Sequence, residues 1–566
     1  MNQPRSRRWR RLGLVAVALG AIALPSAARP AGEGLLPKVA LAQLSAPVVT
    51  QYIAAHPDSG FGTVGSRLAA ANKKPNRLQV GPAGCKSVQE TGSSGPNQAD
   101  VFNCDGLGLP QNEESIGVCT ANRDVVLGGT NDYRGIVDPD GNFTGWHFSL
   151  DGGRTVTNEG LLPPVSSIKN PAQRVPSGGD PVDFIYADGT GCHTFAAGLA
   201  FTSSDPFDTT QSNGIAVYRS EPSILASCPG GPDPSCWPTR RLIAEGAAGH
   251  FLDKPWMTVG SQDGVPYVWV TWSDFDFTNS AVPFTASVKA ARCDITLTTC
   301  IGPIAISTID DDIQFSDVTV GPDGRAYITW SKISGELEGA PQTFTHKIRV
   351  ETAPGSAVFG PEHVIYAENR AIPFGGFMQA NDFRVATYPK SDVAWVNGHP
   401  RVFVVWEACA YRLFEQVCEY SEIKLSYSDD RGATWHGPYV ISTGGVNYFP
   451  SISVDRADPA TKKLSVAWYT NRYDAFNNAQ DVVLAGVDTG QASYGPEAST
   501  RLTNPSNEPE ADPLLGGFFI GDYMEVVQVG KRAWTHYNAN YRQIPVLGLG
   551  LPVNQQDNYL SSDGVG

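Results

Sequence analysis

A repeat of short strand pairs runs through most of this chain and constrains its fold more than any other feature. Each unit opens with a polar or acidic residue and a short strand, passes through a turn with Asp or Gly, and closes with a second strand that often ends in Trp. The second strands are centred near residues 126, 194, 270, 328, 404, 466 and 534, at intervals of 58 to 76 residues. This spacing suits a blade of four antiparallel strands with long loops. We therefore predict an all-β protein, a β-propeller of seven blades, or of six if the first and last fragments share one blade.

One stretch, Ser428–Trp435, predicts a hairpin turn between two strands and fits the pattern S-x-D-x-G-x-T-W. Asp430 can accept hydrogen bonds from turn amides, and Gly432 can adopt positive φ. Trp435 can then fold back and bury its ring against the neighbouring sheet. Ser149–Val156 keeps the pattern except for the final aromatic residue. The polar groups of this motif hold the turn, so the motif predicts architecture and no chemistry.

The composition agrees with a β-rich chain and excludes one class of partner. With 59 Gly, 42 Pro and 10% aromatic residues, the sequence favours many short strands and turns. The net charge of −15 argues against a nucleic-acid partner, and we interpret it as a source of solubility.

The first 42 residues have the pattern of an export signal. A basic end at 5–11 precedes an apolar core of 13 residues, and small-residue cleavage sites follow near residue 28 or residue 42. Ser6-Arg7-Arg8 is a weak sign of twin-arginine export. No later segment approaches 18 uninterrupted apolar residues, so we expect no membrane span in the mature, secreted protein. Residues 43–110 are irregular and are expected to wrap or close the propeller, which takes up 111–566.

The ten cysteines favour an oxidising compartment and a disulfide framework over a metal site. No C-x-x-C motif and no accompanying histidine cluster supports metal binding. Short spacings predict three local disulfides, Cys228–Cys236, Cys293–Cys300 and Cys409–Cys418. The connectivity of the other four cysteines stays open, and these are Cys85, Cys104, Cys119 and Cys192.

Acidic residues head the first strand of most repeat units, which places them on one face of a propeller. In a propeller the first strands line the central axis, and their starts open together on that face. The residues at these starts are Glu114, Asp180, Asp253, Asp317, Asp382 and Asp522. Each acid could cap the amides of its own strand, and recurrence in six units favours that interpretation. A ring of acids could also hold Ca²⁺, which takes six to eight oxygen ligands, although no calcium loop is visible and no cofactor is certain.

The Asp-box turns and the repeat layout resemble the sialidase superfamily, and within it secreted bacterial proteins of the BNR-repeat type. The resemblance covers about 111 to 545, and its phrases are Asn131-Asp132-Tyr133-Arg134, Asp253-Lys254-Pro255-Trp256 and Gly521-Asp522-Tyr523. It implies three substrate-gripping arginines, an aspartic acid as acid/base and a tyrosine nucleophile with its glutamate. The Phe/Tyr-Arg-Ile-Pro motif that carries the first arginine is missing from the start of the first blade. Arg370–Pro373, in the middle of the chain, matches this motif only poorly.

Two functional hypotheses follow from these observations. The first is a monomeric propeller that binds an extracellular glycan or protein through its funnel face. The second is an exo-acting glycoside hydrolase, a divergent sialidase, and a purely structural surface protein has the least support. Candidate catalytic residues are Asp382, Asp522, Tyr523 and Asp253. Candidate ligand-binding residues are Arg134, Asp180, Lys254, Asp317, Arg384 and Arg472.

Overall fold

A computed structural model gives the fold of the greater part of the chain. It describes residues 44, 100–104, 106–208, 210–279, 281–335, 342–372, 376–378, 381–385, 387–414, 417–512, 514–515, 519–545 and 552–565. All of them belong to one compact unit, residues 37–566. The predicted export signal and most of the predicted N-terminal extension lie outside the described residues.

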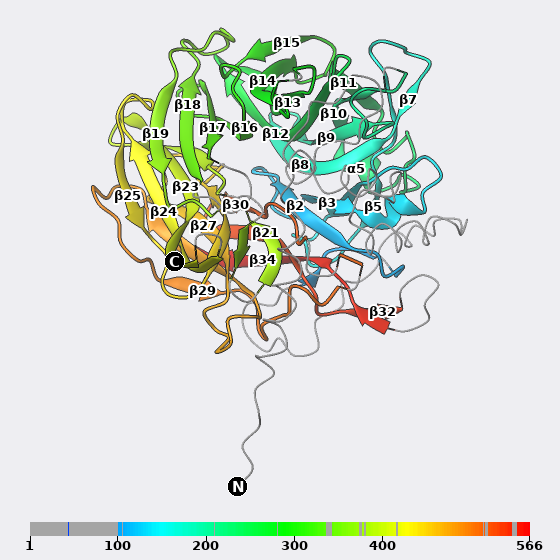
Figure 1. The fold of residues 1–566 in the computed structure, drawn as a ribbon. Coiled ribbons are helices and arrows are strands. Elements are labelled where there is room, and N and C mark those ends of the chain that lie inside the picture. Colours follow the sequence, from blue (N-terminus) through cyan, green and yellow to red (C-terminus); the bar gives the residue numbers. More distant parts are fainter. Residues whose placement is uncertain are drawn as a thin grey trace. The chain divides into compact units, whose positions relative to one another are not determined.

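Seven sheets contain most of the strands, and we number them as blades 1 to 7 along the chain (Figure 1). Blade 1 is, from the innermost strand outward, β2 (Gln111–Val118), β3 (Val126–Asp132), β4 (Thr144–Ser149) and β5 (Asn158–Leu161). Blade 2 is β8 (Ser177–Asp188), β9 (Gly191–Phe201), β10 (Asn213–Ser220) and β11 (Thr239–Glu245). Blade 3 is β12 (His250–Gln262), β13 (Val265–Asp276), β14 (Thr285–Asp294) and β15 (Cys300–Ala305). Blade 4 is β16 (Ile313–Val320), β17 (Ala326–Ser334), β18 (Thr343–Val350) and β19 (His363–Glu368).

The remaining blades have the same order with local additions. Blade 5 is β22 (Lys390–Val396), β23 (His399–Phe414), β24 (Val417–Ser428) and β25 (His436–Val440), with β20 (Gly376–Met378) and β21 (Asn381–Val385) beside β24. Blade 6 is β26 (Asn447–Ser453), β27 (Lys463–Thr470), β28 (Asp481–Asp488) and β29 (Ser499–Arg501). Blade 7 is β30 (Glu525–Val529), β31 (Arg532–Ala539), β34 (Asp557–Gly564) and β1 (Asp100–Val101). Two small ribbons pair β6 (Val165–Ser166) with β7 (Arg174–Val175), and β32 (Gln543–Pro545) with β33 (Pro552–Asn554).

The innermost strands form a closed ring, which confirms the prediction of a seven-bladed propeller. Each innermost strand contacts the next one along the chain, and β30 of blade 7 returns to contact β2 of blade 1. Blade 7 takes its outer strand from far upstream, because Asp100 and Val101 pair with Leu560 and Tyr559 of β34. The second strands carry tryptophans, Trp406, Trp468 and Trp534 among them, which lie within the strands and are buried between neighbouring blades.

A β-bulge interrupts the innermost strand of five blades at the same place. The pairing register skips two residues in blades 1, 2, 3, 4 and 6. In each bulge a non-glycine residue has left-handed backbone conformation, with φ between 49° and 60°, and these residues are Glu113, Asp180, Lys254, Phe315 and Phe449. This conformation costs about 1 to 2 kcal/mol in a residue with a Cβ. A bulge re-aims a side chain, and strained backbone of this kind collects at functional sites.

The register corrects the alignment of the acidic strand starts. Glu113, Asp180 and Lys254 are structurally equivalent, whereas Asp253 precedes this position and Glu114 follows it. The fifth unit also differs from the prediction, because Asn381–Val385 pairs with β20 and the innermost strand of blade 5 is Lys390–Val396. Pairing partners, rather than the acidic start, decide which segment becomes the inner strand. Asp522 likewise lies before the first residue of β30.

The three local disulfides predicted from spacing are present, and a fourth joins two blades. Cys228–Cys236, Cys293–Cys300 and Cys409–Cys418 each close a short loop, while Cys119–Cys192 spans 73 residues between blades 1 and 2. Cys104 is disulfide-bonded as well, and Cys85 lies outside the described residues.

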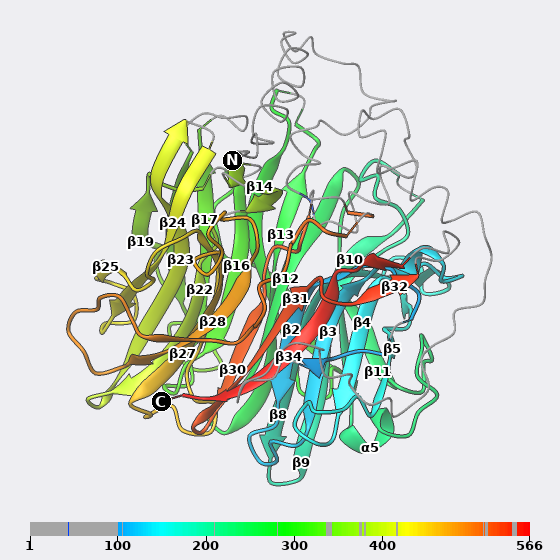
Figure 2. The same ribbon diagram turned by 90° about the horizontal axis from the view of Figure 1, so that it is seen from below.

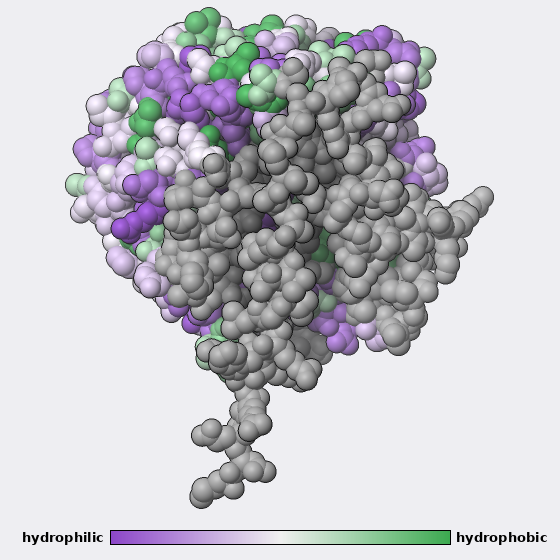
Figure 3. All heavy atoms as spheres, in the orientation of Figure 1, coloured by the Kyte–Doolittle hydropathy of each residue, from purple (hydrophilic) through white to green (hydrophobic). Residues whose placement is uncertain are grey.

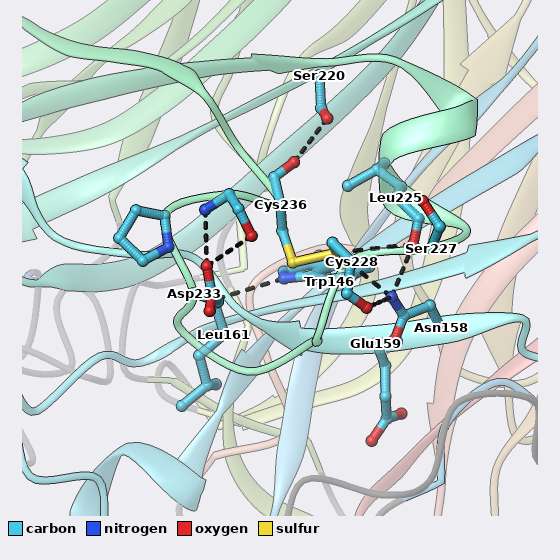
Figure 4. Close-up of a disulfide and its surroundings, with 12 residues drawn as sticks. Trp146, Asn158, Glu159, Leu161, Ser220, Leu225, Ser227, Cys228, Asp233 and Cys236 are labelled. Carbon is cyan, nitrogen blue, oxygen red and sulfur yellow. Dashed lines mark hydrogen bonds between the residues drawn. A yellow bond between two sulfur atoms is a disulfide. The ribbon is translucent and has the colours of Figure 1, made fainter.

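Figure 4 shows how the Cys228–Cys236 loop is tied to blade 1. Asn158 of β5 donates its side-chain amide to the carbonyls of Leu225 and Cys228 at 2.7 and 3.0 Å. Ser220 donates its hydroxyl to the carbonyl of Cys236 at 2.6 Å. The loop therefore fastens blade 2 to the outer edge of blade 1.

The predicted hairpin turn at Ser428–Trp435 joins β24 to β25 and is held by Asp430. Its carboxylate accepts from the amide of Thr434 at 2.8 Å and from the hydroxyl of Thr434 at 2.6 Å. Asp151 makes the same two bonds with Thr155 at 2.9 and 2.7 Å in blade 1. On the face shown in Figure 3, the described surface is mostly hydrophilic or intermediate, with hydrophobic residues in small groups. No helix among the described residues is long and apolar enough to cross a membrane.

Candidate functional site

The bulges of blades 1 to 3 and two segments from blades 5 and 7 bring charged side chains together at the propeller axis. We call this set the ion cluster, and its members are Glu113, Asp180, Asp253, Lys254, Arg384 and Asp522. Each side chain is at most 7% exposed. Five of the six were predicted as site residues, and the structure brings these five together although they lie up to 342 positions apart in the chain. Glu113 was missed because its neighbour Glu114 was taken as the start of the strand.

Asp522 is the anionic centre of the ion cluster. Arg384 grips it with two hydrogen bonds, Nε to Oδ1 at 2.8 Å and Nη2 to Oδ2 at 2.5 Å, and the Lys254 ammonium bonds the same Oδ2. Burial raises the pKa of the Asp522 carboxyl, but the charges of Arg384 and Lys254 outweigh burial and hold the pKa at about 2. Asp522 is therefore ionised at every physiological pH.

Glu113 and Asp180 form an acid pair on the other side of Lys254. The Lys254 ammonium lies 4.0 Å from Oε1 of Glu113, and Asn131 donates to Oε2 of Glu113 at 2.8 Å. Burial raises the pKa of both carboxyls, and in Asp180 the charge of Glu113 raises it further, well above its ordinary value. The ion cluster therefore shifts the pKa values of two of its carboxyls in opposite directions, upward for Asp180 and downward for Asp522.

Tyr523 and Asp253 complete the surroundings of the ion cluster. The Tyr523 hydroxyl donates to the carbonyl of Pro181 at 2.8 Å. Burial and the charge of Glu113 raise the pKa of this phenol well above its ordinary value. Both effects oppose a nucleophilic role for Tyr523 in this arrangement. Asp253 acts on the cluster through its charge, which contributes to the raised pKa values of Asp180 and Arg384.

The opposite half of the ring of bulges is aromatic rather than charged. The left-handed residues of blades 4 and 6 are Phe315 and Phe449. Phe315 packs against Tyr388 with ring centres 4.8 Å apart, and Phe449 packs against Tyr448 at 5.5 Å. One repeated backbone device thus builds a site with a charged half in blades 1 to 3 and an aromatic half in blades 4 and 6.

Asp317 was predicted to lie with the other acids, but it lines a central cavity instead. Its carboxylate accepts from the amide and the hydroxyl of Ser391 at 2.8 and 2.7 Å and lies 4.0 Å from Lys390. The cavity has a volume of about 280 Å³ and is also lined by Trp256 and Glu525. The Lys390 ammonium lies 2.8 Å from the centre of the Trp256 ring, and burial lowers the pKa of this lysine to about 7.

Two further predicted site residues, Arg134 and Arg472, make their contacts outside the ion cluster. Arg134 is buried in blade 1, where it pairs with Asp132 and, at 2.9 Å, with Glu159. Arg472 lies in the loop after β27 and donates to the hydroxyl of Thr443 at 2.8 Å. Asp382 is on β21, two residues before Arg384, and its side chain lies outside the described residues. Its catalytic role stays a prediction.

Among the described residues, no group of three or more His, Cys, Asp or Glu side chains is arranged to hold a metal ion. Two cations already neutralise part of the acid charge in the ion cluster. The described residues therefore provide no ligand set for the Ca²⁺ that the acidic ring could hold.

Comparisons with known proteins give only distant structural matches. No protein-family model and no curated protein matches the chain. Among solved structures, the GH93 α-L-arabinofuranosidase of Fusarium graminearum with arabinobiose is similar at 13% identity, with a TM-score of 0.37 over 72% of this chain and 98% of that chain. The Trypanosoma rangeli sialidase in complex with sialic acid is similar at 9% identity, with a TM-score of 0.36 over 71% and 56%. At these identities and TM-scores the matches assign no activity to this chain. The fold assignment depends on the sheet topology instead.

Proposed function

We propose that this protein is an extracellular, sialidase-like propeller that binds a neutral glycan at the ion cluster. The observation that carries the proposal is the state of Arg384. Its guanidinium already donates twice to Asp522 and, through Nη1, to the carbonyl of Leu44 at 2.9 Å. An arginine that grips a carboxylate of its own chain has no bidentate face left for an acidic sugar. Arg134 is paired in the same way with Asp132 and Glu159.

Neutral sugars suit the rest of the site. Their hydroxyls donate to carboxyl oxygens, and their apolar ring faces pack against aromatic side chains. Glu113 and Asp180 supply the oxygens on the charged half, and Phe315 and Phe449 belong to the aromatic half. Four described disulfides are consistent with an extracellular location. A protein ligand, the other partner anticipated from the sequence, is an outcome of the tests below.

Calorimetric titration with neutral and sialylated oligosaccharides tests this proposal. Asp180→Ala should weaken the binding of a neutral ligand by about two- to tenfold, because one hydrogen bond to an uncharged carboxyl group is worth about 0.5 to 1.5 kcal/mol. The matched control is Asp183→Ala, which removes a buried carboxyl of the same strand that bonds Ser115 at 2.5 Å. Preferential binding of sialylated ligands, or equal losses in the two variants, would contradict the proposal.

A second candidate, glycoside hydrolysis, is favoured by the contrast between Asp180 and Asp522. A hydrolase of this class needs one protonated and one ionised carboxyl group at the same site. Here burial and Glu113 raise the pKa of Asp180, whereas Arg384 and Lys254 keep Asp522 ionised. The Lys254 ammonium bridges the ionised carboxylate and the acid pair.

Turnover of fluorogenic neutral glycosides separates the two candidates. As the general acid, Asp180 would support turnover that persists at neutral pH and falls as the pH rises through its raised pKa. Asp180→Asn keeps hydrogen-bonding groups but holds no transferable proton, so it should abolish turnover and preserve binding. If no glycoside is hydrolysed while saccharides still bind, only the binding function is supported. If turnover survives in Asp180→Asn, this residue is not the general acid.

A further inference from the structure

Exposed aromatic side chains lie near the end of the second strand and the start of the third in blade 5, and on the connection between these strands in blade 6. Phe476 is 81% exposed, Tyr411 is 56% exposed and Tyr420 is 41% exposed. In a propeller these connections lie on the same face as the starts of the innermost strands. The three rings therefore belong to the rim of the face that carries the ion cluster. We call them the rim aromatics.

The two tyrosines are fixed on a stapled hairpin. β23 and β24 form the long hairpin of blade 5, drawn in yellow-green and yellow in Figure 2. Tyr411 and Tyr420 stand directly opposite each other in its register. The adjoining disulfide Cys409–Cys418 is buried, at 1% exposure for each cysteine. The staple holds the hairpin while both phenol rings remain in solvent.

The loop that carries Phe476 is equally well held. The Asp474 carboxylate accepts from the amides of Asn478 and Ala479 at 2.8 and 2.9 Å. Asn471 donates its side-chain amide to the carbonyl of Asn477 at 3.1 Å. A loop fixed by these bonds presents a phenyl ring to water instead of burying it.

The rim aromatics are continuous with the ion cluster through β20 and β21. β20 pairs with the hairpin tip, since Phe377 and Met378 are in register with Val417 and Cys418. Asn381 of β21 donates to the carbonyl of Asn478 in the Phe476 loop at 3.1 Å.

Arg384, three residues further along β21, grips Asp522. Three residues of a strand span roughly 10 Å, so these two contacts of β21 lie about that far apart, and a ligand that covers both subsites is longer than one sugar ring.

We propose that the rim aromatics are a second subsite, which stacks the distal sugar rings of a neutral saccharide chain whose end lies at the ion cluster. This inference rests on the proposed glycan binding and defines the ligand as an oligosaccharide or polysaccharide. Ring faces of sugars stack on flat aromatic side chains, and their hydroxyls need polar partners beside each ring. The rim supplies both, because Asn477 and Asn478 follow Phe476 directly and the Arg472 guanidinium donates to the hydroxyl of Tyr473 at 2.6 Å.

The test is the dependence of affinity on chain length, measured by calorimetry with neutral oligosaccharides of one to six units. A six-unit ligand should bind at least about fivefold more tightly than a two-unit ligand, the gain expected from partly covering one large aromatic ring. Phe476→Ala should remove most of this gain and leave two-unit binding unchanged, and Tyr411→Ala combined with Tyr420→Ala should do the same. The control is Val358→Ala, which removes an exposed apolar side chain (58% exposed) outside the rim.

Three outcomes separate this inference from the function on which it rests. If no saccharide binds the unaltered protein, the proposed glycan binding is wrong. If saccharides bind without a gain from chain length, or if the gain survives in both rim variants, the rim subsite is wrong and the cluster site stands. If the rim variants lose binding to a protein ligand instead, the surface serves a protein partner and the saccharide assignment is refuted.

Discussion

The ion pairs of Asp522 make a quantitative prediction about stability. Asp522→Asn removes the charge that holds two buried cations, Lys254 at 2% exposure and Arg384 at 7%. Removing one partner of a buried ion pair costs about 3 to 5 kcal/mol, because the other charge stays buried without compensation. Lys254→Met should cost less, since Arg384 still pairs with Asp522.

Acid titration gives the same ion pairs a second signature. The folded pKa of Asp522 is about 2, below its ordinary value of 3.8. The stabilisation is therefore complete above about pH 4 and is lost as the pH falls through 2. The difference is worth about 2 kcal/mol. The Asp522→Asn variant should lack this part of the acid slope.

Urea denaturation followed by tryptophan fluorescence measures both effects, at pH 7 and between pH 4 and 2. Lys254→Met, Asp522→Asn and the double variant complete a mutant cycle. Residues in direct contact should show a coupling energy of about 1 to 3 kcal/mol. A loss below about 1 kcal/mol in Asp522→Asn, or additive losses in the cycle, would refute the buried cluster as described.

Three further predictions concern other parts of the fold. Burial raises the pKa of Glu525 to about 7 from 4.5, so ionisation of this group lowers the free energy of unfolding as the pH rises from about 4.5 to 7. Glu525→Gln should remove about 3 kcal/mol of this pH-dependent change, measured by urea titrations across that pH range. Replacing Cys119 and Cys192 with Ala opens a loop of 73 residues and should cost about 4 kcal/mol by the loop-entropy relation, against about 2 for each short disulfide; equal losses on denaturation would contradict this. Asp430→Ala removes two hydrogen bonds to Thr434 and should cost about 1 to 3 kcal/mol, with faster proteolysis in this turn as the local readout.

The strand repeat predicted the architecture because propeller blades keep their hydrophobic pattern and turn chemistry in the sequence. Trp330, Trp406 and Trp468 identify second strands, although the strands continue beyond them, and each is fully buried. Local disulfides were predictable for a similar reason, since residues seven to nine positions apart meet in one hairpin or loop. Cys119–Cys192 was not, because its two ends meet only when blades 1 and 2 pack together.

The site was predictable in composition but not in register. A bulge adds residues to one strand without changing the hydrophobic pattern, so Glu113 could not be told from Glu114. The left-handed conformation of Glu113, Asp180 and Lys254 has no sequence signal, because glycine usually marks such positions. The pairing of Arg384 with Asp522 joins residues 138 positions apart. Only the closed ring brings these two segments together.

The most direct test of the account is calorimetric binding of matched neutral and sialylated oligosaccharides to the unaltered protein and to Asp180→Ala. If the ion cluster binds a neutral glycan, the neutral ligand binds, sialylation gives no gain, and Asp180→Ala weakens neutral binding by about two- to tenfold. Tighter binding of the sialylated ligand would show that an arginine is available for an acidic sugar. That result would contradict the ion cluster as a neutral-glycan site.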